Sequence, residues 1–252
     1  MKVLVGCEYS GIVRDAFIRA GHDAISCDIV PSESDFGPHH QGDLLEYIET
    51  HGHEFDLLIA HPPCTHLSVS GARWFPPHTK EGEVGYKPLH LRFEALAFVD
   101  KILNCNIPMI CLENPLSVIS GFIRKSDQTI QPWQFGHLES KRTCLWLKGL
   151  PPLNHTDNVH DEMMLLDVKV RNRIWWMGSG KGKERSKFYT GFAEAMAAQW
   201  GSINGEPCTE CGQPMSSNKF DDEYHDECYE HKIYKEAAQE DAFMQELKEE
   251  KI

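Results

Sequence analysis

The sequence of 252 residues lacks any apolar run that approaches the roughly 20 residues needed to cross a bilayer. Its opening, MKVLVGCEYSG, has one lysine and no cleavable apolar segment, so we expect no signal peptide. Basic residues are also in the minority, with 25 Lys and Arg against 38 Asp and Glu, a formal net charge of −13. These absences predict a soluble, cytoplasmic protein with no membrane partner, and they argue against a uniformly basic nucleic-acid binder.

Disulfides are not expected, although the chain has nine cysteines. The number is odd, the chain is long enough to bury a core, and no export signal precedes it. Reduced thiols, metal ligands or a nucleophile are the better interpretations.

Charge is unevenly distributed along the chain. Residues 201–252 carry −9 of the net charge, and the stretch from Lys169 to Lys187 has seven basic residues against one acid, with Trp175 and Trp176 among them. Such a stretch could meet a polyanion, or it could be an ordinary solvated face. The six candidate contacts are Lys169, Arg171, Arg173, Lys181, Lys183 and Arg185.

Strand-like and helix-like segments alternate over the first half of the chain. Short apolar runs at 1–7, 23–29, 54–61 and 107–114 predict strands, and helical spacing is found at 11–21 and 88–105. This alternation predicts an α/β fold, a Rossmann-like doubly wound, mostly parallel sheet with helices on both faces. Later, 143–150 reads as a strand, 157–164 as a loop and 191–201 as a helix.

Three segments are expected in the domain organisation. We predict a main domain at 1–201, a small metal-binding module at 202–232 after a linker at 202–205, and an acidic helical tail at 233–252. The acidic tail could contact a protein partner.

Two polar side chains follow neighbouring predicted strands. Cys64 comes after two prolines at the end of one strand, and Glu113 with Asn114 ends another. Ligands of open α/β sheets bind at the carboxyl ends of the strands, where a thiol and an acid form a working pair for activating an electron-poor ring. Burial there is expected to raise the pKa of Glu113. Taken singly, Cys64 could be a core cysteine and Glu113 a helix cap or a surface charge.

The turn after the first strand, residues 6–11, has a glycine at each end. Glycines at a strand-to-helix junction let a nucleotide-like cofactor approach the backbone, although ordinary turns need glycine too. Asp28, at the end of the second predicted strand, favours the cofactor interpretation because an acid there commonly binds ribose hydroxyls.

The C-terminal part contains two pairs of metal-ligating residues. The pairs have the spacing of a structural zinc site in which all four positions are filled. The four predicted zinc ligands are Cys208, Cys211, His225 and Cys228, with His231 as a substitute ligand. The alternative is that these cysteines are loose thiols in the tail.

The order and content of these motifs resemble the DNA cytosine-5 methyltransferases, in a small form of the kind found in phages and prophages. The resemblance covers roughly residues 1–201. Pro62, Pro63 and Cys64 resemble the Pro-Cys nucleophile loop of that family, and Glu113 with Asn114 its Glu-Asn motif.

The resemblance implies further site residues. It implies that Arg142 contacts the cytosine ring as a third catalytic residue, and that S-adenosylmethionine, or a modified form of it, is the cofactor. The implied cofactor-binding residues are Tyr9, Ser10, Gly11, Asp28, Ile29, Asp43, Pro62 and Gly191. The basic stretch becomes a DNA contact in this interpretation. Fewer than fifty residues separate Arg142 from Ser186, too few for the large target-recognition domain usual in the family.

The resemblance also implies a reaction. The Cys64 thiolate would attack carbon 6 of a flipped-out cytosine, Glu113 would hydrogen-bond to N3, and carbon 5 would accept a methyl group before the thiolate leaves. Two alternatives stay open: an inactive relative that only binds nucleic acid or a partner, and an enzyme that acts on free cytosine nucleotides or transfers another group. Transfer to an exocyclic amine is disfavoured because Cys64 stands where that chemistry uses an aromatic residue.

Overall fold

The computed structural model describes residues 1–177, 181–207 and 214–216. The chain divides into two compact units, Met1–Gly201 and Ser202–Ile252. In the second unit, strands β8 (Ile203–Pro207) and β9 (Pro214–Ser216) pair antiparallel. The predicted linker at 202–205 therefore includes the start of a strand.

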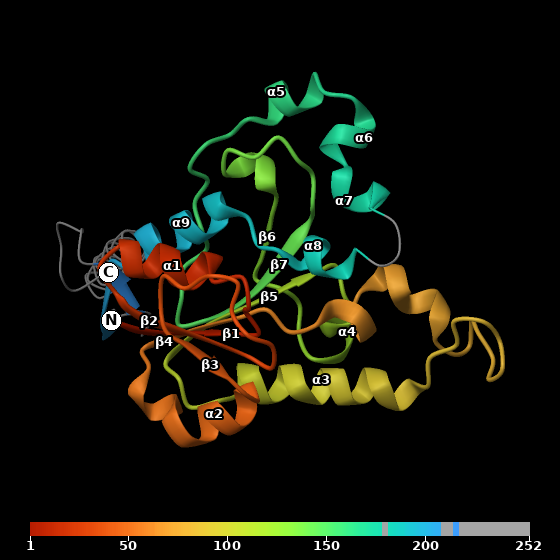
Figure 1. The fold of residues 1–252 in the computed structure, drawn as a ribbon, viewed down its shortest axis with the longest axis horizontal. Helices are drawn as coiled ribbons and strands as arrows, with labels where there is room; N and C mark the ends of the chain where they lie inside the picture. The colour runs from red at the N-terminus through yellow and green to blue at the C-terminus, as the bar shows by residue number, and fades with distance from the viewer. Residues whose placement is uncertain (178–180, 208–213, 217–252) are drawn as a thin grey trace, which may run out of the picture. The chain divides into compact units, whose positions relative to one another are not determined.

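The first unit is built on a seven-stranded sheet with the order β3-β2-β1-β4-β5-β7-β6 (Figure 1). Strands β1 to β5 run parallel to one another, whereas β7 is antiparallel to both β5 and β6. The predicted mixed α/β, mostly parallel sheet is confirmed. The strands are β1 (Lys2–Gly6), β2 (Asp23–Asp28), β3 (His39–Gln41), β4 (Leu57–Ala60), β5 (Met109–Pro115), β6 (Gln128–Ile130) and β7 (Thr143–Lys148).

Helices cover both faces of this sheet (Figure 1). On one face, α1 and α9 lie together with Phe17, Phe192 and Trp200 buried. On the other face, Leu96 and Ile102 of α3 belong to the core cluster formed with the sheet. The longer helices are α1 (Ile12–Arg19), α2 (Leu44–His51), α3 (Leu89–Leu103) and α9 (Thr190–Trp200); the shorter ones are α4 (Ile119–Phe122), α5 (His160–Met164), α6 (Val168–Arg171), α7 (Arg173–Trp176) and α8 (Gly182–Ser186). No helix in the described ranges is long and apolar enough to cross a membrane.

The segment predicted as a loop at 157–164 contains helix α5. Met163 is the single buried residue of this helix. The segment therefore lacks the repeated apolar positions from which a helix could be predicted. The three-residue strands β3 and β6 lie at the two edges of the sheet and carry no apolar run that could have predicted them.

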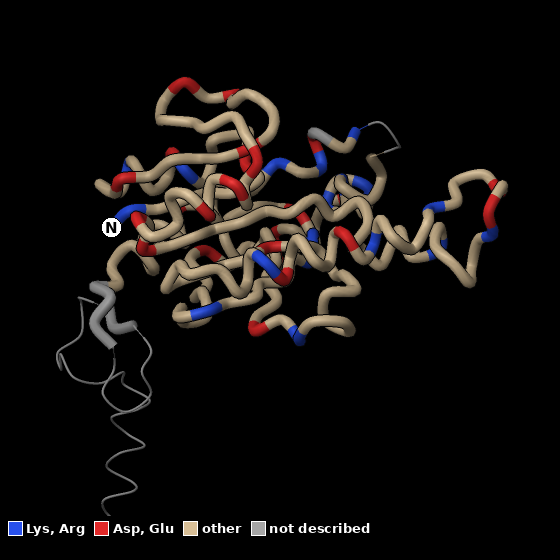
Figure 2. The backbone as a smooth tube through the Cα atoms, turned by 90° about the horizontal axis from the view of Figure 1, so that it is seen from below, with Lys and Arg blue, Asp and Glu red and all other residues tan. Residues whose placement is uncertain are grey.

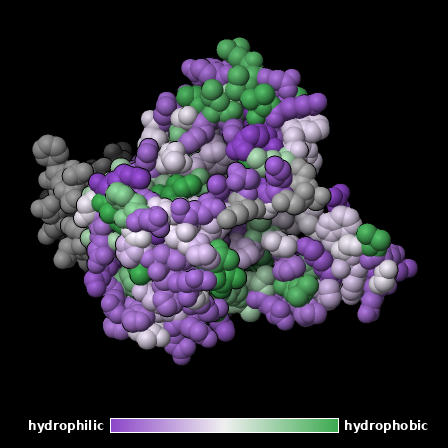
Figure 3. Space-filling view, in the orientation of Figure 1, coloured by the Kyte–Doolittle hydropathy of each residue, from purple (hydrophilic) through white to green (hydrophobic). Residues whose placement is uncertain are grey.

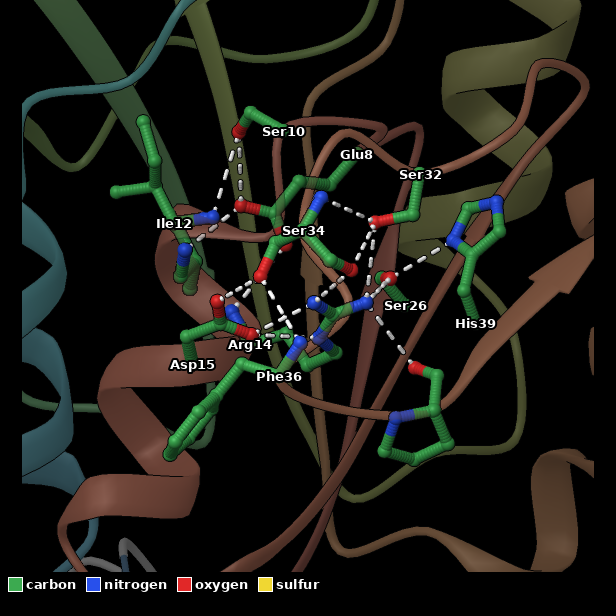
Figure 4. A network of polar contacts seen from close by, with 12 residues as sticks. Glu8, Ser10, Ile12, Arg14, Asp15, Ser26, Ser32, Ser34, Phe36 and His39 are labelled. Carbon is green, nitrogen blue, oxygen red and sulfur yellow. Dashed lines mark hydrogen bonds and ion pairs between the residues drawn. The ribbon is translucent and has the colours of Figure 1, made fainter.

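Arg14 is fully buried in α1 and ties this helix to the loop that follows β2 (Figure 4). Its guanidinium pairs with Asp15 at 2.7 Å and donates hydrogen bonds to Ser26 Oγ at 3.0 Å and the Ser34 carbonyl at 3.0 Å. Gly11 has a positive φ of 74°, and a Cβ there would lie 2.6 Å from the Arg14 guanidinium. The network therefore holds the loop between β2 and β3 beside the turn that connects β1 to α1.

Replacing Arg14 by methionine is expected to lower the free energy of unfolding by roughly 3–5 kcal/mol, because Asp15 would be left as an unpaired buried charge. Urea unfolding of the Arg14→Met variant measures this loss. Arg19→Met is the matched control, since Arg19 is exposed at the end of the same helix. Equal stability of the two variants would contradict a role for the network.

Candidate functional site at the carboxyl edge of the sheet

The strand register aligns four side chains along one edge of the sheet. Gly6 of β1 pairs with Cys27 of β2 and Ala60 of β4, and Ala60 pairs with Leu112 of β5. The residues that follow these partners are Cys7, Asp28, His61 and Glu113. Because the strand order reverses between β1 and β4, this row lies at the topological switch point where open α/β sheets bind ligands.

Cys64 lies in a short 3-10 turn, Cys64–His66, directly beyond this edge. Asn114 fixes the approach to the turn, because its side-chain amide donates a 2.9 Å hydrogen bond to the Pro62 carbonyl.

Two cationic side chains hold the turn itself. Lys87 Nζ donates to the Thr65 carbonyl at 3.0 Å, and Arg92 Nε donates to the His66 carbonyl at 3.3 Å. Lys87, just before α3, and Arg92, in the first turn of α3, therefore anchor the backbone next to Cys64, a role that the sequence did not indicate.

The thiol of Cys64 is partly buried and lies among charges of both signs. Burial and the nearby carboxylate of Glu113 raise the pKa of Cys64, while Lys141 and Arg185 lower it by a smaller amount. The net shift is upward, so this state of the protein holds a thiol at neutral pH. A nucleophilic role for Cys64 then requires that its proton be removed when a substrate is bound.

Alkylation of Cys64 by iodoacetamide is expected to be slow at pH 7 and to keep accelerating as the pH rises above the range in which an ordinary cysteine ionises, because the pKa of Cys64 is raised. Two variants should shift the rate at pH 8 in opposite directions. Glu113→Gln removes a carboxylate and should accelerate modification, whereas Lys141→Met removes a cation and should slow it. Mass spectrometry of the Cys64 peptide measures these rates, and a rate already maximal at pH 7 would contradict the account.

Glu113 is buried and is hydrogen-bonded to a histidine. The distance from His61 Nδ1 to Glu113 Oε2 is 3.2 Å, and both side chains are 11% exposed. Burial raises the pKa of Glu113, but the hydrogen bond from His61 and the positive charge of Lys141 outweigh burial and hold that pKa below its usual value. The sequence-based expectation of a raised pKa is therefore wrong, because neither neighbour was foreseen.

The first turn of the sheet is closed by a buried carboxylate. Glu8 Oε1 accepts a 2.7 Å hydrogen bond from the Val13 N–H, and Glu8 Oε2 accepts one of 3.2 Å from the Arg14 N–H. Ser10 Oγ accepts from the Ile12 N–H at 3.4 Å. These contacts occupy N–H groups at the start of α1, so the start of this helix is capped from within the chain rather than left open to an anion.

Three of the predicted cofactor-binding residues surround the ends of β2 and β3. The Asp28 carboxylate accepts from the Val30 N–H at 3.1 Å, and Ile29 is 72% exposed. Asp43 caps α2 by accepting from the Leu45 N–H at 2.8 Å. Both carboxylates lie close enough to Cys7 to raise the pKa of its thiol further, after burial. The structure therefore brings Asp28 and Asp43 together near the end of β1.

Tyr9 and Gly191 make contacts within the chain. Tyr9 Oη lies 3.2 Å from Ser186 Oγ. The Gly191 N–H donates to His137 Nε2 at 3.0 Å, and a Cβ at Gly191 would lie 2.0 Å from the Phe135 carbonyl oxygen. Gly191 thus permits close packing at the start of α9.

Arg142 is exposed, directly before Thr143, which pairs with Pro115 at the end of β5. The neighbouring Lys141 is the cation whose charge acts on both Glu113 and Cys64. Lys141 Nζ also donates to the Arg185 carbonyl at 3.2 Å. Sequence reasoning named Arg142 in this segment and did not name Lys141, whose charge acts on Glu113 and Cys64.

The six predicted DNA contacts lie between β7 and α9. Lys169 Nζ is 5.5 Å from the ring centroid of Trp176, and Arg173 is committed to Glu139 by hydrogen bonds of 2.8 and 3.1 Å. Arg171 donates to the Met164 carbonyl at 3.4 Å. Lys181 precedes α8, and the backbones of Lys183 and Arg185 belong to this helix. The side chains of Lys181 and Arg185 are exposed.

Exposed apolar side chains accompany these cations. Trp175 is 78% exposed and Leu165 is 87% exposed. Figure 3 shows apolar surface gathered over α5 and the segment after it. Figure 2 shows acidic and basic residues interspersed along the described backbone.

The predicted zinc ligands Cys208, Cys211, His225 and Cys228 lie outside the described residues, as does the tail at 233–252. Within residues 1–177, 181–207 and 214–216, no group of three or more His, Cys, Asp or Glu side chains is arranged to hold a metal ion. The zinc module stays a prediction from the sequence.

No protein-family model matches the chain. No curated protein matches it either. Among solved structures, a protein described as a DNA modification methyltransferase encoded within an E. coli prophage matches with a TM-score of 0.38 and 12% identity, over 58% of this chain and 46% of that one. Spodoptera frugiperda DNMT2 matches with a TM-score of 0.34 and 16% identity, over 58% and 49%. S. pombe Dnmt2 methyltransferase matches with a TM-score of 0.39 and 16% identity, over 67% and 55%. The chain thus spans about half the length of the solved structures that it matches.

Proposed function

We propose that the chain transfers a methyl group from S-adenosylmethionine to carbon 5 of cytosine in DNA through a covalent adduct with Cys64. The observation that supports this proposal most strongly is that Cys64 follows β4 while Glu113 lies near the carboxyl end of the neighbouring parallel strand β5, beside the switch point of the sheet. The carboxylate of Glu113 is close enough to raise the pKa of the Cys64 thiol, so both can act on one small ring.

The residues at the ends of β1 and β2 fit S-adenosylmethionine. The carboxylates of Asp28 and Asp43 lie near the end of β1 and suit a ligand that has positive ammonium and sulfonium groups and ribose hydroxyls. The exposed Ile29 side chain offers apolar contact for an adenine ring. When bound, S-adenosylmethionine would supply an electrophilic methyl group.

The chain's own residues have separate roles in this proposal. Cys64 forms the bond to carbon 6 of cytosine, which makes carbon 5 nucleophilic, and Glu113 hydrogen-bonds to N3. Lys141 and Arg185 contribute positive charge that favours the Cys64 thiolate. Arg142 is exposed beside this edge, where it could contact the ring.

Residues 1–201 are proposed as the catalytic domain, 202–232 as a module with one structural zinc ion, and 233–252 as an acidic tail available to a protein partner. Thiolates and imidazole at all four zinc positions would leave no open coordination site, so the metal would stabilise the module rather than take part in transfer.

The cations around α6 to α8 are proposed to bind DNA phosphates, with the exposed Trp175 available for stacking on bases. In the double variant Lys169→Gln/Lys181→Gln, the slope of log K against log salt should decrease by about 2, because each phosphate contact contributes about 1. Lys101→Gln/Lys125→Gln is the matched control with two exposed lysines elsewhere. Equal slopes in the two double variants, measured by fluorescence anisotropy, would contradict the assignment.

The function is tested by incubating the purified protein with tritiated S-adenosylmethionine and one of three substrates: a cytosine-containing duplex, the same duplex with 5-methylcytosine at every cytosine, and free dCTP. The proposal predicts label in the first substrate alone. Label in the fully methylated duplex would place the target atom elsewhere than carbon 5. Label in dCTP would favour the free-nucleotide enzyme, and DNA binding without label in any substrate would favour the inactive binder.

A further inference from the structure

His61 occupies a position in the site that no step described so far requires. It is the residue directly before Pro62-Pro63-Cys64, and its N–H donates to the Gly6 carbonyl at 2.9 Å, which places it between β1 and β5. Its ring packs against Phe188 with the centroids 4.6 Å apart. His61 therefore lies between Cys7 and Glu113 at the carboxyl edge of the sheet.

The two ring nitrogens of His61 have different surroundings. Nδ1 lies 3.2 Å from Glu113 Oε2, whereas Nε2 is buried and has no hydrogen-bond partner among the described residues. A buried polar atom without a partner costs free energy, which indicates that the ring is held there for its contact with Glu113 or for a state with a bound ligand.

The proposed reaction requires a proton between Glu113 and the base. N3 of cytosine is a hydrogen-bond acceptor, so an ionised carboxylate cannot bond to it directly. Yet the hydrogen bond from His61 and the charge of Lys141 hold the pKa of Glu113 below its usual value, so this carboxyl is ionised at neutral pH. The missing proton must come from a group in contact with Glu113, and among the described residues His61 is hydrogen-bonded to it.

We propose that His61 is a positioning residue that fixes the Glu113 carboxylate and carries the proton that Glu113 presents to the base. This inference rests on the proposed function. In its imidazolium form, with a proton on each ring nitrogen, His61 gives up the Nδ1 proton as an O–H bond forms on Glu113, which leaves a neutral imidazole. That proton is then shared with N3 while the Cys64 thiolate, whose proton has passed to water, adds to carbon 6. After methyl transfer, water takes the proton from carbon 5 as the Cys64 thiolate leaves carbon 6. N3 then returns its proton to Glu113 and Glu113 returns it to His61, so the pair is unchanged over one cycle.

Charged groups face this pair from each neighbouring strand. Glu8, from the turn after β1, interacts electrostatically with His61, and Glu113 contacts it from β5. Lys141, before β7, acts on Glu113, and the Cys64 thiol lies beside the same carboxylate. A proton on His61 therefore has carboxylates on two sides, while the cation of Lys141 lies on the side of Glu113.

The test compares wild type with His61→Asn and His61→Ala. Asparagine can donate a hydrogen bond to Glu113 from nearly the same position but cannot carry a proton to it, whereas alanine removes both functions. The ionisation of Glu113 is followed by NMR of the 13C-labelled carboxyl, assigned with Glu113→Gln. Methyl transfer is measured over pH 5.5–8.5. Because ionisation of Cys64 also changes the transfer rate with pH in all three proteins, it is measured separately by alkylation of Cys64.

In His61→Ala the titration of Glu113 should move upward, because burial then dominates. Wild-type transfer should persist at pH values where Glu113 is ionised. In both variants transfer should fall as this carboxyl ionises, so that His61→Asn at pH 8 loses roughly 10- to 100-fold in kcat, as for residues that orient a reacting group. KM for DNA should change less than about twofold, because the base contact is not itself removed.

Three results would contradict this inference. An unchanged Glu113 titration in His61→Ala would overturn the coupling itself. Full activity of His61→Asn with the wild-type pH profile would overturn the proton role, as would equal losses at every pH, which indicate a merely structural effect. A wild type without transfer on any substrate would instead overturn the proposed function, and the NMR titration would still decide whether His61 and Glu113 share a proton.

Discussion

Cys64→Ser is expected to lose methyl transfer by roughly 10⁴- to 10⁶-fold, the range seen when the nucleophile of a catalytic unit is removed. Without the thiolate, carbon 6 of the base is not attacked and carbon 5 does not become nucleophilic. Folding should be preserved, because Cys64 lies in a short turn whose backbone is held by Lys87 and Arg92 rather than by its own side chain. Radiolabel transfer and thermal unfolding measure the two quantities.

Cys105→Ser is the matched control for this loss. Cys105 is also partly buried but follows α3, at the end of the sheet opposite to Glu113. It should retain nearly full activity. Covalent capture on DNA containing 5-fluorocytosine, which blocks release of the base, should likewise occur with wild type and Cys105→Ser but not with Cys64→Ser. Normal transfer by Cys64→Ser would exclude the covalent mechanism.

Glu113→Gln is expected to lower kcat by about 10²- to 10⁴-fold, as for removal of a general acid. Its effect on KM for DNA should be small, because DNA contact is assigned to cations around α6 to α8. Glutamine keeps the shape of the side chain but cannot accept and pass on the proton of His61. Kinetics at a fixed pH together with DNA binding by anisotropy separate these quantities.

Glu54→Gln provides the control for this substitution. Glu54 also pairs with a histidine, His51 at 2.8 Å, but on the exposed surface. It should therefore leave transfer unchanged. An equal loss of DNA binding and of turnover in Glu113→Gln would indicate that Glu113 supports the structure rather than the reaction.

The sequence predicted the strands that form the centre of the sheet because these strands are buried on both faces and read as continuous apolar runs. Strands β1, β2, β4 and β7 fall within the predicted segments, and β5 extends one residue past its predicted end, to Pro115. The direction of β7 was not predictable, since an antiparallel strand between β5 and β6 has the same apolar pattern as a parallel one. Edge strands of three residues carry no pattern at all.

The sequence allowed prediction of those parts of the candidate site whose positions follow from where the strands end. Cys64, Glu113 and Asp28 could be placed at one edge because parallel strands end together. The sign of the Glu113 pKa shift was not predictable, since it depends on His61 and Lys141, whose contacts are visible only in three dimensions. A signal for His61 did exist, because a histidine ends the same strand that presents Cys64.

The central claim is most directly tested in cells that express the wild-type chain or its Cys64→Ala variant. Their DNA is digested to nucleosides and analysed by mass spectrometry. The account predicts 5-methyldeoxycytidine with wild type and none with Cys64→Ala, in a host that lacks this modification. A modified cytosine of another mass would correct the identity of the transferred group. Unmodified cytosine with wild type, or the same product with both proteins, would contradict methyl transfer through Cys64.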